Sequence, residues 1–205
     1  MAREMDLVVV THPDGRSTET DAELIRQACR SPERFAAVFD RHYRHIYAYA
    51  ARRLGREIAE DVASETFLVA FDRRTGYDTA RVDARPWLYG IASNVIARHA
   101  RAESRRYTML VRADANHVVD AHDEVVAGRI DALAVRGRLA RALARLSQPD
   151  RDVLLLVAWA GLNQQEAAVA LDIPPGTARS RLHRARQAMR QALGAGVEGD
   201  PWWTN

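Results

Sequence analysis

Lysine is absent from this 205-residue sequence, so all 30 of its basic residues are arginines. Cysteine is nearly absent, and the lone Cys29 excludes an internal disulfide and any zinc site built from several cysteines. The longest apolar stretch, Val153 to Ala160, is far shorter than the roughly 18 residues that span a membrane. Glu4 and Asp6 interrupt the first ten residues, which therefore lack the apolar core of a secretory signal. We expect a soluble cytoplasmic protein.

What is present is a globular composition with an uneven distribution of charge. Hydrophobic residues make up 47% and charged residues 28%, which is typical neither of disordered nor of membrane proteins. The net charge of +3 conceals two basic blocks, residues 21–111 at +4 and residues 132–193 at +6. Acidic segments of −2, −3 and −2 lie at residues 1–20, 112–131 and 194–205. The middle acidic segment has no sustained helical period, which predicts a linker between two domains.

Helical periodicity fills both basic blocks. In the first block it predicts helices over about residues 32–54, 57–73 and 85–106, with Ser31 and Pro32 in the positions typical of a helix start. Convincing strands are lacking, because the only β-branched run is Val8 to Thr11. The sequence therefore predicts an all-α fold of two helical domains.

The second block has the pattern of a helix-turn-helix. Helices are predicted over about residues 133–145 and 147–159, followed by a short helix to Leu171, a turn at 172–176 and a helix over 177–193. Asn163 and Glu166 have the spacing of a capping box at the start of the short helix. The last helix presents a basic surface made of Arg179, Ser180, His183, Arg184, Arg186, Gln187 and Arg190. Such a surface suits the major groove of DNA, where arginine can bind guanine, although an ordinary solvated face is the alternative.

Three further groups of residues carry weaker signals. The arginine-rich helix over 85–106 also holds Trp87, Tyr89 and Asn94, which suits unstacked bases, although aromatic residues at helical spacing are more often core. The helix predicted over 57–73 carries an acidic stripe made of Glu57, Glu60, Asp61 and Glu65. We interpret this stripe as a solvated face or as a docking surface for a basic partner. The histidine pairs 42 with 45 and 117 with 122 lack a third ligand, so we expect no metal site.

The motifs together resemble a known family. The runs at 59–67 and 85–94 look like domain two of the extracytoplasmic-function (ECF) sigma factors, and the run at 161–186 is similar to their domain four. The resemblance covers about residues 21–193, with both motifs in the family's order. It implies domain two at 21–107, a flexible acidic linker at 108–131 and domain four at 132–193, between an N-terminal extension at 1–20 and a tail at 194–205.

The resemblance implies a subunit that directs bacterial RNA polymerase to promoters, with no cofactor and no catalytic residue. The expected partners are core polymerase, promoter DNA and an anti-sigma factor. The residues implied for polymerase binding are Glu60, Asp61, Ser64 and Glu65. Those implied for the −10 element, including a flipped base near Asn94, are Trp87, Tyr89, Asn94 and Arg98. Those implied for the −35 element are Arg179, Ser180, His183, Arg184 and Arg186.

Departures from the family pattern and two rival functions stay open at this point. Ser64 stands where the family usually has glutamine, and Gly90 where a basic residue is common. The main rival is a helix-turn-helix regulator that binds DNA through residues 132–193 without polymerase. A more distant rival is a metal-dependent hydrolase that uses His42 and His45.

Overall fold

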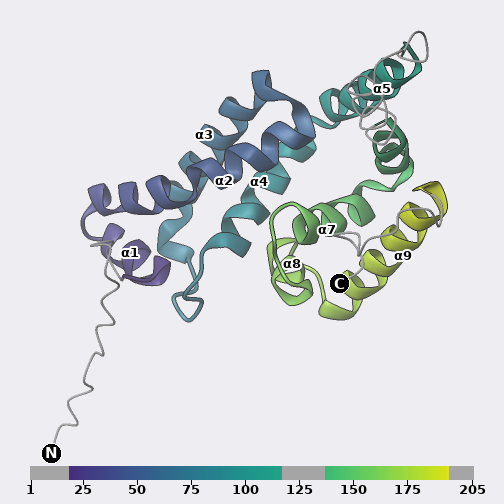
Figure 1. Cartoon of the computed structure of the whole chain (residues 1–205). Helices are drawn as coiled ribbons and strands as arrows, with labels where there is room; N and C mark the ends of the chain where they lie inside the picture. The colour runs from purple at the N-terminus through teal and green to yellow at the C-terminus, as the bar shows by residue number, and fades with distance from the viewer. Residues whose placement is uncertain (1–18, 117–136, 194–205) are drawn as a thin grey trace, which may run out of the picture.

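The computed structural model describes residues 19–116 and 137–193, and these residues contain helices and no strand. The expectation of an all-α fold is thereby confirmed. Figure 1 shows one group of helices formed by the N-terminal half and a second group formed by the C-terminal half. The first group consists of α1 (Asp21–Ala28), η1 (Pro32–Phe35), α2 (Ala36–Leu54), α3 (Arg56–Arg73), η2 (Arg74–Gly76), α4 (Arg85–Arg98) and α5 (Ala100–Asn116). The second group consists of a helical segment at 137–145, α7 (Gln148–Ala158), α8 (Gln164–Ala170) and α9 (Pro175–Leu193).

The long helices α2 and α3 form a hairpin that packs on α4. Gly55 separates the two helices with a φ of +95°, a backbone conformation that glycine adopts without steric strain. The α3 helix buries Val62 and Phe67 between its neighbours, and α4 buries Leu88 and Ile96 against them. Burial of such apolar side chains is the main stabilising term of the hairpin.

Helix α1 is absent from the sequence-based expectations, although its start carries a recognisable signal. The side chain of Thr20 accepts a hydrogen bond from the Glu23 amide at 3.2 Å, and Glu23 accepts one from the Thr20 amide at 2.7 Å. This is a capping box, and the Thr-x-x-Glu spacing in the sequence is its signature. The helix is held down by buried Asp21, whose carboxylate lies 2.8 Å from Nε2 of His42 and accepts the Ala84 amide at 2.9 Å. Asp21 therefore joins α1 to α2 and to the start of α4.

The helix predicted over 85–106 is two helices in the structure. α4 ends at Arg98, and His99 breaks the helix with φ −98° and ψ 21°. The carbonyl of His99 accepts hydrogen bonds from the amides of Ala102 and Glu103, which starts α5 in a new direction. α5 then continues to Asn116, so residues 108–116 of the predicted linker are helical. The remainder of that linker, residues 117–131, lies outside the described residues, as do the extension at 1–18 and the tail at 194–205.

The helix-turn-helix forms as the sequence predicts. Asn163 accepts the amides of Gln165 and Glu166, both at 2.9 Å, and Glu166 accepts the Asn163 amide at 2.7 Å, which confirms the capping box at α8. After α8, Asp172 adopts a φ of +50°, and the amides of Asp172 and Ile173 bond back to carbonyls of α8. This is the hydrogen-bond pattern of a Schellman motif, and it turns the chain sharply into α9.

The two groups of helices pack against each other. Buried apolar residues from both groups belong to one contiguous cluster, which runs from Ala22 in α1 to Met189 in α9. The main contact between the groups joins α4 to α8. Figure 1 shows α7 and α8 lying beside the first group, with α9 on the outer side.

Candidate nucleic-acid interface

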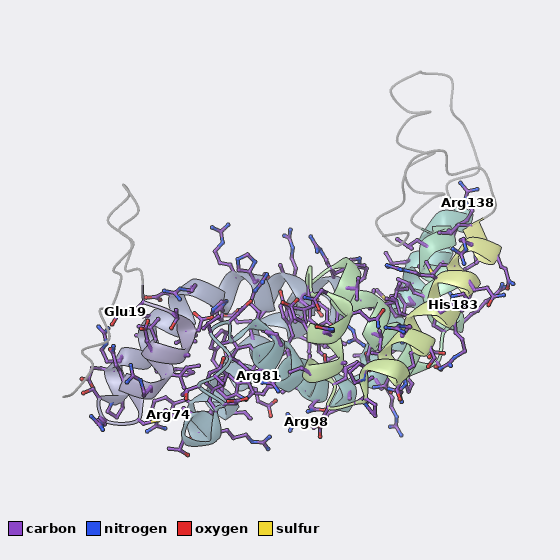
Figure 2. All side chains as sticks on the ribbon, turned by 90° about the horizontal axis from the view of Figure 1, so that it is seen from below. Glu19, Arg74, Arg81, Arg98, Arg138 and His183 are labelled. Carbon is purple, nitrogen blue, oxygen red and sulfur yellow. The ribbon has the colours of Figure 1, made fainter. Side chains whose placement is uncertain are left out.

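The α9 helix presents polar side chains on the face opposite its core contacts. Ala178, Leu182, Ala185 and Met189 are buried at positions that recur every three or four residues, as the apolar stripe of an amphipathic helix requires. Four of the predicted −35 residues are exposed on the outer face: Arg179, Ser180, His183 and Arg184. The fifth, Arg186, follows buried Leu182 by one turn and is half-buried at the edge of the apolar stripe. Figure 2 shows His183 on α9, far from Glu19 at the other end of the molecule.

Two of these arginines, Arg184 and Arg186, lie close to other charged side chains. Arg184 donates from Nη2 to Asp150 Oδ1 at 2.7 Å and from Nε to Asp150 Oδ2 at 3.3 Å, which ties α9 to the first turn of α7. Arg186 lies in a partly buried position beside Arg190, and burial together with the charge of Arg190 lowers the pKa of its guanidinium. A nearby phosphate would relieve that repulsion, because an anion favours both charged arginines.

One face of α4 brings together three of the four predicted −10 residues. Trp87, Asn94 and Arg98 lie at i, i+7 and i+11, a spacing that places them along one side of a helix. The Trp87 ring is half-buried and lies with its centroid 4.9 Å from that of Tyr77. Tyr77 is itself fixed, because its hydroxyl donates to the carbonyl of Arg81 at 2.5 Å. The loop before α4 is thereby held against the indole.

Tyr89, the fourth of these residues, lies on the opposite side of α4. Its side chain is buried, and its ring makes an edge contact with Tyr49 of α2 at a centroid distance of 5.2 Å. Burial, followed by the proximity of Tyr49, raises the pKa of Tyr89 to about 12. The physical reason is helical geometry, since a residue two positions after Trp87 points about 200° around the helix. The structure therefore does not place Tyr89 with Trp87, Asn94 and Arg98.

The residues predicted to bind polymerase lie on the outer face of α3. Glu60, Asp61 and Ser64 are exposed, Glu65 is half-buried, and Leu68 exposes 61% of its surface one turn further on. Glu65 forms an ion pair with Arg98 of α4. The acidic face of α3 and the predicted −10 face of α4 therefore meet at this pair.

A cleft of about 920 Å³ lies between α4 and the helix-turn-helix. Trp87 and Asn94 line it from the first group, and Gln165 and Ile173 line it from the second. Arg73 and Arg81 also line this space, so both a planar aromatic surface and positive charge are present. Sequence reasoning singles out Trp87 and Asn94 but not their neighbours from α8, because that proximity depends on how the two groups pack.

A buried ionic cluster also joins the two groups. Arg53 of α2 is fully buried, donates from Nε to Glu103 Oε1 at 2.7 Å and has Nη2 2.7 Å from Asp152 Oδ1 of α7. The second contact is a charge contact outside hydrogen-bond geometry. Glu103 also accepts a hydrogen bond from Nη1 of Arg151 at 3.1 Å, and the hydroxyl of Tyr107 lies 3.3 Å away.

The charges of this cluster balance, with two arginines and two carboxylates. Burial alone would lower the pKa of Arg53, but Tyr49, Asp152 and Glu103 raise it well above its usual value. Burial raises the pKa of Asp152, against the lowering effect of Arg53. The sequence offers one clue to the cluster: Arg53 interrupts the apolar stripe of its helix at a position beside Ala50 and Leu54.

His42 and His45, considered from the sequence as metal ligands, lie in different surroundings in the structure. His42 is buried against Asp21, whereas His45 is exposed on α2, and no group of three ligating side chains occurs within residues 19–116 and 137–193. His117 and His122 lie outside the described residues. In the same ranges no helix is both long and apolar enough to cross a membrane.

Comparison with known proteins shows the family to which this chain belongs. Residues 38–106 match the family model for Sigma-70 region 2, and residues 136–189 match that for Sigma-70, region 4. The ECF RNA polymerase sigma factor SigL of Mycobacterium tuberculosis is 33% identical over 159 residues, which cover 77% of this chain and 87% of that protein. This chain belongs to the ECF sigma factors. SigC of the same species is 36% identical over 131 residues, covering 64% of the sigma factor described here and 68% of its relative.

Two solved structures share the fold of this sigma factor. The structure of CnrH in complex with the cytosolic domain of CnrY matches with a TM-score of 0.61 and 25% identity, over 86% of this sigma factor and 99% of that chain. The sigma factor RpoE of Bartonella quintana, in complex with the anti-sigma factor NepR, shares the fold with a TM-score of 0.54, over 79% and 98% of the two chains.

The sigma factor is accordingly a promoter-specific initiation factor that binds RNA polymerase and promoter DNA. This confirms the function that the sequence resemblance implies, and it decides against a regulator that acts without polymerase. α8 and most of α9 lie within the region 4 match, and α3, α4 and most of α2 lie within the region 2 match.

Proposed function

We propose that α9 reads the −35 element as duplex DNA. The observation that supports this is the exposed outer face of α9, on which Arg179, Ser180 and His183 occupy the N-terminal half. In a helix-turn-helix, that half of the second helix contacts base edges. An arginine that binds guanine with two hydrogen bonds contributes about 1 to 3 kcal/mol of discrimination. Arg184 contacts DNA only after exchanging its Asp150 partner for a base or phosphate, and Arg186 grips phosphate.

The −10 element is bound along α4 in this proposal. Trp87 offers a stacking surface for an unpaired base, Asn94 donates and accepts hydrogen bonds at the base edge, and Arg98 neutralises phosphate. Unstacking a base costs a few kcal/mol, which stacking on the indole offsets in part. Tyr89 acts indirectly, because its buried ring fixes the position of α4 on α2.

The acidic face of α3 binds core polymerase. Its carboxylates suit a basic partner surface, and exposed Leu68 adds apolar contact area at the same face. Complementary charge favours fast and specific docking more than it adds affinity. Ser64, between Asp61 and Glu65 on this face, supplies a hydroxyl at the contact.

The remaining expectations follow from this assignment. The chain acts by binding, without catalytic residues, cofactor or metal, and it acts in the cytoplasm where polymerase is. An anti-sigma factor is a further partner. The structural relative RpoE is in complex with the anti-sigma factor NepR, and the relative CnrH is in complex with the cytosolic domain of CnrY.

Transcription from a randomised promoter library tests the site assignment. The sigma factor and core polymerase are mixed with templates randomised at both elements, and the transcribed promoters are sequenced. Arg179→Ala is expected to weaken the preference for the favoured base about 5- to 150-fold at one or two −35 positions, because 1 to 3 kcal/mol corresponds to such a factor. Asn94→Ala is expected to change preference at the −10 element alone.

Arg138→Ala is the matched control, because Arg138 is an exposed arginine of the same domain that lies outside α9. It is expected to leave both preferences unchanged. An Arg179→Ala variant with the parent's −35 preference would refute the assignment of α9, and an Asn94→Ala variant with the parent's −10 preference would refute that of α4.

A further inference from the structure

A pocket lined by basic and polar side chains lies where α1 passes into η1. Its volume is about 300 Å³, and its lining residues are Arg26, Gln27, Arg30, Ser31 and Arg34. None of these described lining residues is apolar, so the pocket does not suit the apolar face of a protein partner. Figure 2 shows Glu19, which pairs with Arg34, at the end of the molecule opposite His183 of α9. The pocket therefore belongs to neither of the DNA-binding faces proposed above.

The local backbone brings the three arginines of this pocket together. Arg26 and Arg30 are four residues apart, which makes them neighbours along one side of α1 and the turn that ends it. Ser31 then leaves the helical conformation with φ −128° and ψ 86°, and Pro32 begins η1. η1 packs against α1, and this places Arg34 beside the other two arginines.

The end of α1 does not use the guanidinium groups of Arg26 and Arg30. The carbonyl of Ala28 accepts a hydrogen bond from Nε of Arg74 at 3.0 Å, and the carbonyl of Gln27 accepts the Arg30 amide at 2.9 Å. The side chains of Arg26 and Arg30 are exposed, and within residues 19–116 and 137–193 they form no ion pair. Both guanidinium groups are therefore available to a ligand.

Arg34 is held in place by partners that leave one side of its guanidinium open. Its Nε donates to Oε1 of Gln27 at 2.7 Å, and its Nη2 donates to Oε2 of Glu19 at 2.6 Å. Nε2 of Gln27 in turn donates to Oε1 of Glu19 at 2.7 Å. Nη1 of Arg34 makes no hydrogen bond in the part of the chain that the structure describes. A side chain that is already fixed loses little conformational freedom when it binds a ligand.

The charges around the pocket do not balance. Three arginines face one carboxylate, that of Glu19, which leaves an excess of two positive charges among the lining residues and their ion-pair partner. An anion between the arginines would relieve their mutual repulsion. A terminal phosphate carries about 1.5 to 2 negative charges at pH 7 and three acceptor oxygens, and the fork of arginine suits phosphate geometry. Ser31 adds a hydroxyl donor, since its side chain makes no capping hydrogen bond.

We propose that this pocket binds the terminal phosphate of a small phosphorylated molecule, such as a nucleoside diphosphate. The inference goes beyond the function proposed above and uses none of the assigned −10 or −35 residues. A DNA backbone offers the same chemistry with less charge, because each phosphodiester carries a single negative charge. The excess of two positive charges in the pocket therefore favours a terminal phosphate over a phosphodiester.

Nuclear magnetic resonance of the isotope-labelled full chain reports binding at the pocket itself. The probe is inorganic pyrophosphate, added stepwise to the free sigma factor. The amide signals of Gln27, Arg30 and Ser31 and the Nε–H signals of the pocket arginines are expected to shift and to saturate. The basic face of α9 also attracts anions, and its signals are followed in the same spectra, so that the two sites are measured separately.

Arg30→Gln is expected to weaken binding of pyrophosphate at the pocket about ten-fold or more, because a hydrogen bond between charged groups contributes at least such a factor. Arg26→Gln is expected to have the same effect. Arg44→Gln is the matched control, because Arg44 is an exposed arginine of α2 outside the pocket, and it should leave the dissociation constant unchanged. Pocket signals that do not saturate in the parent, or equal binding by the Arg30→Gln and Arg44→Gln variants, would overturn the phosphate site.

A second titration distinguishes the two sources of phosphate. Its probe is a single-stranded DNA oligomer with hydroxyl groups at both ends, which carries phosphodiesters alone. This oligomer is expected to bind at the pocket signals about ten-fold more weakly than pyrophosphate. Equal or tighter binding of the oligomer at these signals would overturn the assignment to a terminal phosphate and would assign the pocket to a nucleic-acid backbone. The promoter-library experiment is independent of this outcome, because its variants lie in α4 and α9.

Discussion

Replacing Glu103 with glutamine is expected to destabilise this sigma factor strongly. Glu103 is 1% exposed and serves as the shared acceptor of Arg53 at 2.7 Å and of Arg151 at 3.1 Å. Glutamine keeps the shape but removes the charge, so the cluster would hold two guanidinium groups against the single carboxylate of Asp152. Uncompensated charge in a buried site is costly, because the protein interior solvates it poorly.

The magnitude follows from which contacts survive. Breaking a buried ion pair by removing one partner costs about 3 to 5 kcal/mol. The lower end applies here, because Arg53 keeps Asp152 and the Tyr49 hydroxyl, and Arg151 keeps the carbonyls of Leu143 and Leu146, each at 2.9 Å. For a chain of this length, about 3 kcal/mol corresponds to a midpoint of thermal unfolding roughly 6 to 12 °C lower.

Thermal unfolding followed by circular dichroism at pH 7 measures this effect. Asp72→Asn is the control, because Asp72 is an exposed carboxylate of α3, and its replacement is expected to change stability by less than about 0.5 kcal/mol. If Glu103→Gln unfolded within 1 or 2 °C of the parent, as the control should, the buried cluster would not contribute net stability and the reasoning above would be wrong.

Two further predictions concern the residues at the starts of α1 and α8. Burial alone would raise the pKa of Asp21, but hydrogen bonds from His42, the Ala84 amide and Arg41 lower it to about 2. Ionised Asp21 therefore contributes about 2 kcal/mol of stability that is fully present above the unfolded-state pKa of 3.8 and is lost as pH falls through about 2. Urea unfolding at several pH values should show Asp21→Asn less stable than the parent at pH 6, with the gap narrowing below pH 3.8; a gap independent of pH would contradict the linkage. Asn163→Ala removes the acceptor of two α8 amides and is expected to cost about 1 kcal/mol in the same assay, whereas Asn163→Ser should retain most of the stability.

Local signals account for most of what could be predicted from the sequence. The capping box at Asn163 and the period of α9 depend on residues a few positions apart, so they were readable without tertiary structure. The start of α1 also carries a local signal, because Thr20 and Glu23 have the spacing of a capping box. The break at His99 was not predictable in this way, because the helical pattern continues through it and only the packing of α5 requires the change of direction.

The candidate site shows the same division between local and tertiary information. Helical spacing alone puts Trp87, Asn94 and Arg98 on one side of α4 and Tyr89 on another, so the burial of Tyr89 could have been inferred once the helix was assigned. The Arg184–Asp150 pair joins residues 34 positions apart, and the Arg53–Asp152 pair joins residues about 100 apart. Sequence spacing carries no information about such pairs without a tertiary arrangement.

The sequence by itself determined the all-α class, the helix-turn-helix and the family of this protein, because helix periodicity, capping and motif order are local properties of the chain. The tertiary structure decided that the two groups of helices close on each other, with Gly90 against Ala170 and Arg53 buried among partners from both groups. The physical reason is that this closure depends on shape and charge at contacts between distant segments. From the sequence alone, a glycine within a helix indicates only a low helix propensity. That it allows another backbone to approach closely can be seen only in the tertiary structure.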